Sequence, residues 1–321
     1  MIFGELEQLY HQPLFDLISQ SRAVHLRHWR GEEIQRCSLL SIKTGGCSED
    51  CAYCAQSAHY STGLEREELL SVETVLAAAS RARSHGATRF CMGAAWRGVR
   101  DGSEKFDRVL EIVRQVCQLG MEVCVTLGEI GPLEARKLKA AGGDPYNHNI
   151  NTSPEFYREI VSTHTFQNRL ATIAAVQQSG MSVCCGGIIG MGESQADRLR
   201  MLEVLSNFDP APDSVPINCL MPMPGTPLAD QPPVDIFELV RLVAVARIAL
   251  PKARVRLAAG RSRISRAGQA LCFFAGANSI FYGDKLLTAK NPAADVDVGL
   301  LRELGLHVES MTNDECLMTK E

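Results

Sequence analysis

Short runs of apolar and β-branched residues alternate along this chain with longer amphipathic stretches. The short runs lie at 38–44, 88–94, 121–127, 145–150, 182–188, 214–219, 253–258 and 278–282. The longer stretches have helical spacing and lie at 72–85, 104–119, 134–141, 166–179, 195–208 and 235–250. This alternation predicts a parallel sheet, and eight units favour a closed TIM-type (β/α)8 barrel over an open doubly wound sheet.

The barrel pattern does not reach either end of the chain. Residues 1–37 are expected to form an N-terminal helical extension, 38–302 the barrel, and 303–321 a polar, weakly ordered C-terminal tail. The 321 residues suit one barrel with extensions, because such a barrel typically needs about 250.

Composition and charge narrow the possible partners. The chain has 33 Lys and Arg against 37 Asp and Glu, a net charge of −4, so nothing suggests binding to nucleic acid or to an anionic membrane. No apolar run approaches a membrane span, and the stretch 1–9 carries two glutamates and no basic residue, unlike a targeting peptide. A cytoplasmic protein is expected.

Twelve cysteines are many for such a chain, and in a reducing compartment they favour metal binding over disulfides. Cys47, Cys51 and Cys54 form a C-x3-C-x2-C triplet. Iron–sulfur cubanes normally take four cysteine thiolates, so three would leave one iron open to a small molecule. The alternatives are a partial zinc site or a chance grouping.

A second group emerges from the period-two pattern of the strands. Cys91, Cys124, Cys184 and Arg256 each lie opposite the apolar face of a different strand and are predicted to point into the barrel. Such a set could enclose a second cluster. The alternative is that the cysteines pack as small apolar residues and Arg256 pairs with an acid. Cys185 is assigned to the helix-facing layer, and Cys37 is interpreted as a packing or surface thiol.

Polar and glycine residues follow the strand ends, where barrel enzymes place ligand contacts. Asn149 and Asn218 carry amides that suit a urea-like or carboxyl substrate, although structural hydrogen bonds would explain them too. The glycine-rich stretch 186–192 is a weak phosphate motif, but it would let the backbone at Gly187 and Ile188 approach a flat ligand such as adenine.

The sequence resembles the biotin synthase family of radical S-adenosylmethionine (SAM) enzymes over roughly residues 10–305. The segments that carry the resemblance are 41–45 before the triplet, 89–96, 146–149, 214–218, 255–257, 270–273 and 278–283. The triplet alone is typical of the radical SAM superfamily. The set Cys91, Cys124, Cys184 and Arg256 narrows the resemblance to biotin synthases.

The resemblance implies a reaction and its cofactors. A 4Fe-4S cluster on the triplet would reduce SAM to methionine and a 5′-deoxyadenosyl radical. That radical would abstract hydrogen from dethiobiotin, and sulfide from a 2Fe-2S cluster on Cys91, Cys124, Cys184 and Arg256 would close the ring. The family also implies a flavodoxin- or ferredoxin-type electron donor, iron–sulfur assembly machinery and a homodimer.

The resemblance also assigns ligand contacts. Asn149 and Asn218 match substrate contacts, Asn149 and Asn151 match SAM contacts, and the backbone of Tyr53 and Ile188 matches adenine contacts. Two positions depart from the family: Asn151 stands where an Asp is common, and Ala55 where Pro is common. Two other functions stay open from the residues, namely a radical SAM barrel with a different substrate and a non-catalytic zinc or iron–sulfur protein.

Overall fold

Parallel strands form a closed barrel in the computed structural model, which describes residues 1–309. The strands are β1 (Glu33–Lys43), β2 (Arg89–Ala94), β3 (Glu122–Thr126), β4 (Tyr146–Asn147), β5 (Val183–Cys184), β6 (Gly187–Ile189), β7 (Ser214–Cys219), β8 (Arg254–Leu257) and β9 (Ser279–Phe281). They pair in parallel in the order β1-β2-β3-β4-β5-β7-β8-β9, β6 also pairs with β7, and Gln35 opposite Ser279 joins β1 to β9. The predicted (β/α)8 barrel is confirmed.

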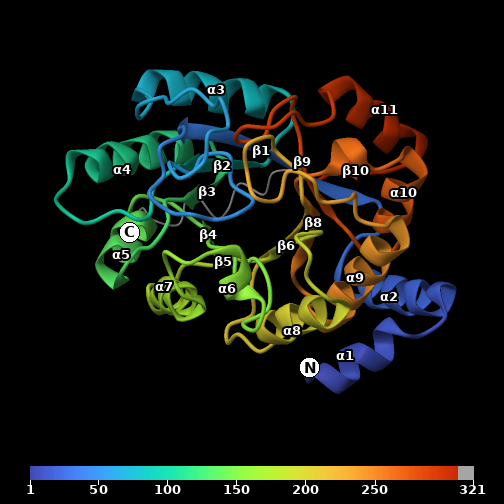
Figure 1. The fold of residues 1–321 in the computed structure, drawn as a ribbon. Coiled ribbons are helices and arrows are strands. Elements are labelled where there is room, and N and C mark those ends of the chain that lie inside the picture. The colour runs from blue at the N-terminus through green and yellow to red at the C-terminus, as the bar shows by residue number, and fades with distance from the viewer. Residues whose placement is uncertain (310–321) are drawn as a thin grey trace.

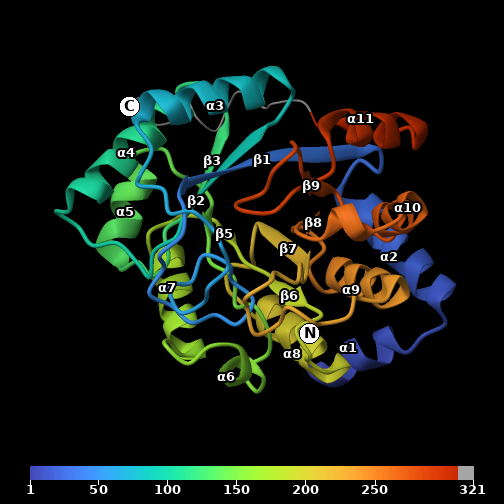
Figure 2. The ribbon, with the colours of Figure 1, turned by 45° about the horizontal axis from the view of Figure 1, so that its top comes forward.

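Helices surround this barrel on the outside (Figures 1 and 2). They are α3 (Val72–Ser84), α4 (Glu104–Cys117), α5 (Pro132–Ala140), α6 (Tyr157–Ile160), α7 (Phe166–Gln178), α8 (Gln195–Ser206), α9 (Ile236–Ala249) and α10 (Arg266–Phe274). Helix α4 illustrates how they form. The Ser103 side chain caps its first turn by accepting a hydrogen bond from Phe106 N–H, and the apolar face buries Phe106, Val109 and Val113.

The fifth strand of the barrel is interrupted, because β5 and β6 both pair with β7 and are separated by Cys185 and Gly186. A Cβ atom at Gly186 would lie 2.0 Å from the carbonyl oxygen of Pro216, so this close approach requires glycine. The interruption places Ile188 beside Asn218 at the carboxyl end of the strands, where barrel enzymes build their sites.

The two ends of the described chain meet at β1. Helices α1 (Phe3–Tyr10) and α2 (Leu14–His28) pack on α8 and α9, and β1 then begins at Glu33. After α11 (Ala294–Glu303), the short strand β10 (His307–Val308) pairs with Glu33 and Ile34. The rest of the predicted tail, 310–321, lies outside the described residues. Of the helices in residues 1–309, none combines the length and apolar character needed to cross a membrane.

Candidate functional site

The triplet Cys47, Cys51 and Cys54 lies in the loop that follows β1, at the carboxyl end of the barrel. Backbone hydrogen bonds shape this loop: Cys47 N–H donates to Gln56 O at 2.9 Å, and Cys54 N–H donates to Cys51 O at 2.9 Å. All three thiols are free. The chain therefore presents three soft donors on one tightly turned segment.

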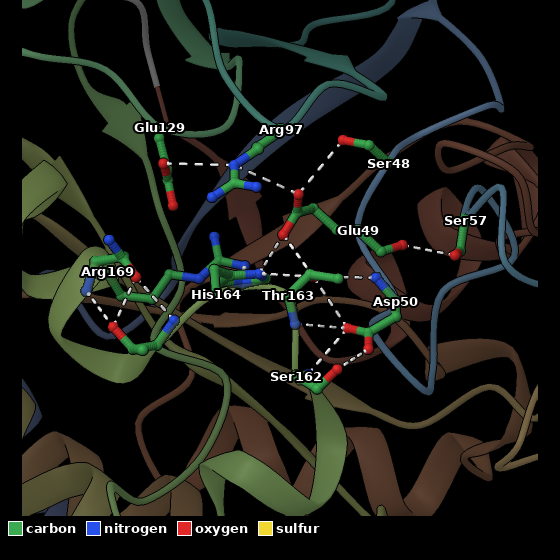
Figure 3. Close-up of polar contacts among 12 residues, drawn as sticks. Ser48, Glu49, Asp50, Ser57, Arg97, Glu129, Ser162, Thr163, His164 and Arg169 are labelled. Carbon is green, nitrogen blue, oxygen red and sulfur yellow. Dashed lines mark hydrogen bonds and ion pairs between the residues drawn. The ribbon is translucent and has the colours of Figure 1, made fainter.

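The acidic residues between these cysteines anchor the loop to the segment after α6 (Figure 3). The Asp50 carboxylate accepts backbone N–H bonds from Ser162 at 3.0 Å and Thr163 at 3.1 Å. Glu49 accepts a hydrogen bond from the Thr163 hydroxyl at 2.7 Å and pairs with His164. Burial favours the neutral form of the Glu49 carboxyl, but the Thr163 hydroxyl and His164 keep its pKa below the usual range, so Glu49 is ionised at neutral pH.

Cys51 belongs to a small apolar cluster that also contains Tyr53, Cys54 and Ile188. The structure thus brings the two predicted adenine contacts together with two thiols of the triplet. Burial raises the pKa of Cys51 to about 12, and the neighbouring Cys54 adds to the effect. Nearby positive charge favours the charged form of a thiol, so iron ions would stabilise a thiolate at this position.

The three asparagines that were predicted to contact ligands make hydrogen bonds to the interrupted fifth strand. Asn149 Oδ1 accepts a hydrogen bond from Gly186 N–H at 3.0 Å, and Asn218 Nδ2 donates to Gly187 O at 2.9 Å. Asn151 is buried in the left-handed region with φ 70°, and its carbonyl accepts from Ile188 N–H at 2.8 Å. Asn149, Asn151, Gly187, Ile188 and Asn218 therefore lie together at the carboxyl end of the barrel.

A separate group of sulfur atoms lies inside the barrel. Cys91, Cys124 and Cys184 are buried and pack with one another, and the group also contains Cys37. Cys91 and Cys124 stand side by side on β2 and β3. We call these four residues the inner thiol group. Cys185 packs in the core outside the barrel wall, so the predicted opposite directions of Cys184 and Cys185 are confirmed.

Arg256 is the cation beside the inner thiol group, with 1% of its surface exposed. Its Nε donates to Ser279 Oγ at 2.9 Å, its Nη2 donates to Gln35 Oε1 at 3.2 Å, and its Nη1 lies 3.7 Å from Cys184 Sγ. Within residues 1–309 it makes no ion pair with a carboxylate, so the expected alternative of an acid partner is not observed.

The charge of Arg256 is therefore available to the thiols. The hydrogen bond with Cys124, helped by the Arg256 cation, lowers the pKa of Cys184 to about 6 despite complete burial. A buried guanidinium that lies beside the inner thiols and pairs with no carboxylate of residues 1–309 fits an anionic iron–sulfur cluster.

The guanidinium of Arg89, unlike that of Arg256, is paired with carboxylates. It is equally buried, and it binds Glu122 at 2.5 Å and Asp213 at 2.8 Å. In the part of the chain that the structure describes, no group of His, Cys, Asp and Glu is arranged to hold a single metal ion.

Sequence reasoning missed several residues around the inner thiol group: Gln35, Cys37, Arg89, Asn147 and Ser279. Asn147 Nδ2 donates to Cys184 Sγ at 3.3 Å. The signal for Cys37 was present, since Gln35, Cys37 and Leu39 alternate along one strand face, but the apolar run that defined the strand began only at residue 38.

Comparisons with known proteins identify the family. Residues 41–205 match the Radical SAM superfamily, and 216–307 match the Biotin and Thiamin Synthesis associated domain. The chain is 58% identical to the biotin synthase of Ruegeria pomeroyi, covering 94% of this chain and 95% of that protein. It is 56% identical to the biotin synthase of Synechococcus elongatus, covering 94% of each.

Solved structures show the same fold at low identity. Methylornithine synthase has a TM-score of 0.81 at 19% identity, covering 97% of this chain and 94% of that one. The FeFe-hydrogenase maturase HydG from Carboxydothermus hydrogenoformans has a TM-score of 0.81 at 18% identity, covering 99% and 79%. The full-length similarity to the curated relatives shows that this chain belongs to the biotin synthase family of radical SAM enzymes.

Proposed function

We propose that this chain converts dethiobiotin to biotin by inserting sulfur in a radical SAM reaction. The observation that carries the proposal is the inner thiol group with Arg256. A general radical SAM barrel needs only the triplet, whereas this chain places four further thiols inside the same barrel, beside a guanidinium that pairs with no carboxylate among the described residues. The relatives from Ruegeria pomeroyi and Synechococcus elongatus, which match nearly the whole chain, are biotin synthases.

The two donor sets divide the cofactors between them. Cys47, Cys51 and Cys54 would hold the 4Fe-4S cluster, and its open iron would bind SAM. Cys91, Cys124, Cys184 and Arg256 would hold the 2Fe-2S cluster. When bound, these groups supply reductive SAM cleavage, hydrogen abstraction and the sulfur atom. The barrel keeps the second set away from solvent, since all four side chains are buried.

The amides at the carboxyl end would orient the ligands. Among the described residues, Asn149 uses its oxygen for Gly186 and Asn147, which leaves its NH2 group to donate to a ureido carbonyl or to SAM. Asn218 is held at both ends, by Gly187 O and by Ala259 N–H at 3.1 Å, so a substrate would meet it in a fixed orientation.

The remaining contacts concern SAM. Tyr53 and Ile188 would form an apolar wall against adenine. The backbone of Gly187 would lie beside that wall, and the Asn151 amide would face the ribose without the charge of an Asp.

We further propose the organisation and partners that the family implies. The chain would divide into the extension 1–37, the barrel 38–302 and the tail 303–321, with the first barrel strand β1 beginning inside the extension at Glu33. A flavodoxin- or ferredoxin-type protein would supply electrons, iron–sulfur assembly machinery would load both clusters, and two chains would form a homodimer. A cytoplasmic location is consistent with free thiols that must stay reduced to bind iron.

Anaerobic reconstitution tests the proposed function. The loaded protein should contain iron and sulfide for both a 4Fe-4S and a 2Fe-2S cluster and show the absorption of each. It should form biotin from dethiobiotin in the presence of SAM and a reductant. SAM cleavage without biotin formation, in protein that holds both clusters, would show that the substrate is a different molecule.

A further inference from the structure

Cys37 is a fourth thiol inside the barrel. It is fully buried on β1 and packs with Cys91, Cys124 and Cys184, in a group separate from the main apolar core. In the strand register it stands between Arg89 on β2 and Phe281 on β9. The barrel interior therefore offers four thiols in one contiguous group.

The Cys37 thiol and the Arg256 guanidinium lie side by side because they share two partners. Gln35 Oε1 is 3.3 Å from Cys37 Sγ and 3.2 Å from Arg256 Nη2. Ser279 Oγ is 3.6 Å from Cys37 Sγ and 2.9 Å from Arg256 Nε. A cluster that reaches Arg256 from Cys91 and Cys184 is therefore also next to Cys37.

We propose that Cys37 is a reserve ligand of the second cluster, which takes the coordination position of Arg256 when the guanidinium is absent. This inference rests on the 2Fe-2S site of the proposed function. Iron–sulfur clusters are normally held by four cysteine thiolates, so a fourth thiol next to the cluster site can complete the ligand set once the Arg256 side chain is removed. On binding iron, the Cys37 thiol gives its proton to the buffer and no electron is exchanged.

The proposal is tested by removing the two candidate ligands singly and together. Wild type, Cys37→Ala, Arg256→Met and the double variant Cys37→Ala/Arg256→Met are reconstituted anaerobically, and iron, sulfide and visible absorption are measured. Cys37→Ala should keep both clusters. Arg256→Met should keep the iron and sulfide of the second cluster with shifted absorption bands. The double variant should lose the second cluster and keep the first.

The chain provides a matched control in Cys185. This cysteine is also fully buried and adjoins Cys184, but it packs outside the barrel wall. Cys185→Ala/Arg256→Met should therefore resemble Arg256→Met alone in cluster content and spectrum. Arg256→Lys, with and without Cys37→Ala, repeats the comparison with a buried cation in place if circular dichroism shows that Arg256→Met does not fold.

Two results would overturn the inference alone: equal cluster content and spectra for Arg256→Met and the double variant, or loss of the second cluster in a folded Arg256→Met protein. A wild-type protein that binds only the first cluster would instead overturn the second-cluster assignment, and this inference with it.

Discussion

Asp50 and Thr163 are 113 residues apart in the sequence and make three hydrogen bonds with each other. The Thr163 backbone N–H donates to the Asp50 carboxylate at 3.1 Å, and Asp50 N–H donates to the Thr163 hydroxyl at 3.3 Å. The hydroxyl shares its single hydrogen between the Asp50 carboxylate at 3.0 Å and the Glu49 carboxylate at 2.7 Å. Because Asp50 lies between Cys47 and Cys51, this contact fixes the shape of the cluster loop. The loop is thus held by the chain itself as well as by any bound iron.

Thr163→Val should weaken the attachment of the cluster loop to the segment after α6. The substitution keeps the shape of the side chain and removes a hydroxyl that binds both Glu49 and Asp50. We expect a loss of about 1–3 kcal/mol in the free energy of unfolding and faster release of iron from the first cluster. Denaturant midpoints and iron release to a chelator measure the two effects. Thr163→Ser keeps the hydroxyl and should have the wild-type denaturant midpoint and rate of iron release. Equal iron release from the Val and Ser variants would contradict the role of the hydroxyl.

Cys51→Ala should abolish the first cluster and SAM cleavage while the fold persists. The triplet lies in a loop outside the barrel strands, so strand packing does not depend on this thiol. Iron counting and SAM cleavage on reconstituted protein check the first part, and far-ultraviolet circular dichroism checks the second. Wild-type SAM cleavage in this variant would refute the assignment of the triplet.

Cys184→Ser and Cys185→Ser should behave differently although the residues are adjacent. Cys184 faces Arg256 and the inner thiol group, so its replacement should destabilise the second cluster and stop biotin formation while SAM cleavage continues. Cys185→Ser should keep both clusters and cost about 1–3 kcal/mol, because it buries a hydroxyl in the apolar core. Cluster absorption and denaturant midpoints distinguish them, and the reverse pattern would mean that the lumen assignment is wrong.

Gly187→Ala should destabilise the carboxyl end of the barrel. A Cβ atom there would lie 2.0 Å from Met201 Sδ and 2.5 Å from Asn151 O, so the interrupted strand must shift. We expect a loss of about 1–3 kcal/mol and weaker SAM binding, measured by denaturant unfolding and by titration. Gly299→Ala in α11 is the control, since nothing lies within 4 Å of its new Cβ, and it should stabilise the helix by about 0.5–1 kcal/mol.

His25 should make stability depend on pH. It is buried in α2, its Nδ1 has no hydrogen-bond partner within residues 1–309, and burial with the Arg247 charge lowers its pKa to about 3. The folded protein therefore favours the neutral ring. Since the unfolded pKa is near 6.5, this contribution is complete above pH 6.5 and is lost as the pH falls toward 3.

His25→Gln removes the titration and should flatten the dependence of the denaturant midpoint on pH between 6.5 and 4. An unchanged slope in this variant would show that other groups cause the dependence.

The strand and helix alternation was predictable because each barrel unit carries its own apolar face. All eight predicted strands are present, and Cys91, Cys124, Cys184 and Arg256 do share the interior, since period two fixes the face of each residue. The direction of these four side chains could therefore be predicted from the local sequence alone.

The features of the fold and of the site that could not be predicted depend on contacts between segments far apart in the sequence. The first strand begins at Glu33 rather than near 38, because Gln35 and Arg36 are polar residues that only the closing contact with β9 turns into strand residues. For the same reason Cys37 was not recognised as an interior thiol. Arg89 gave no signal either, because Glu122 and Asp213, which neutralise it, lie on other elements of the barrel.

The pairing of β1 with β9 has a consequence for biosynthesis. Gln35 is among the first barrel residues to leave the ribosome and Ser279 among the last, yet both hold Arg256 in place. The chamber around the inner thiols is therefore incomplete during almost all of translation. Its thiols can be enclosed with iron only after the last strand has been made, so assembly of this cofactor must follow synthesis of the chain.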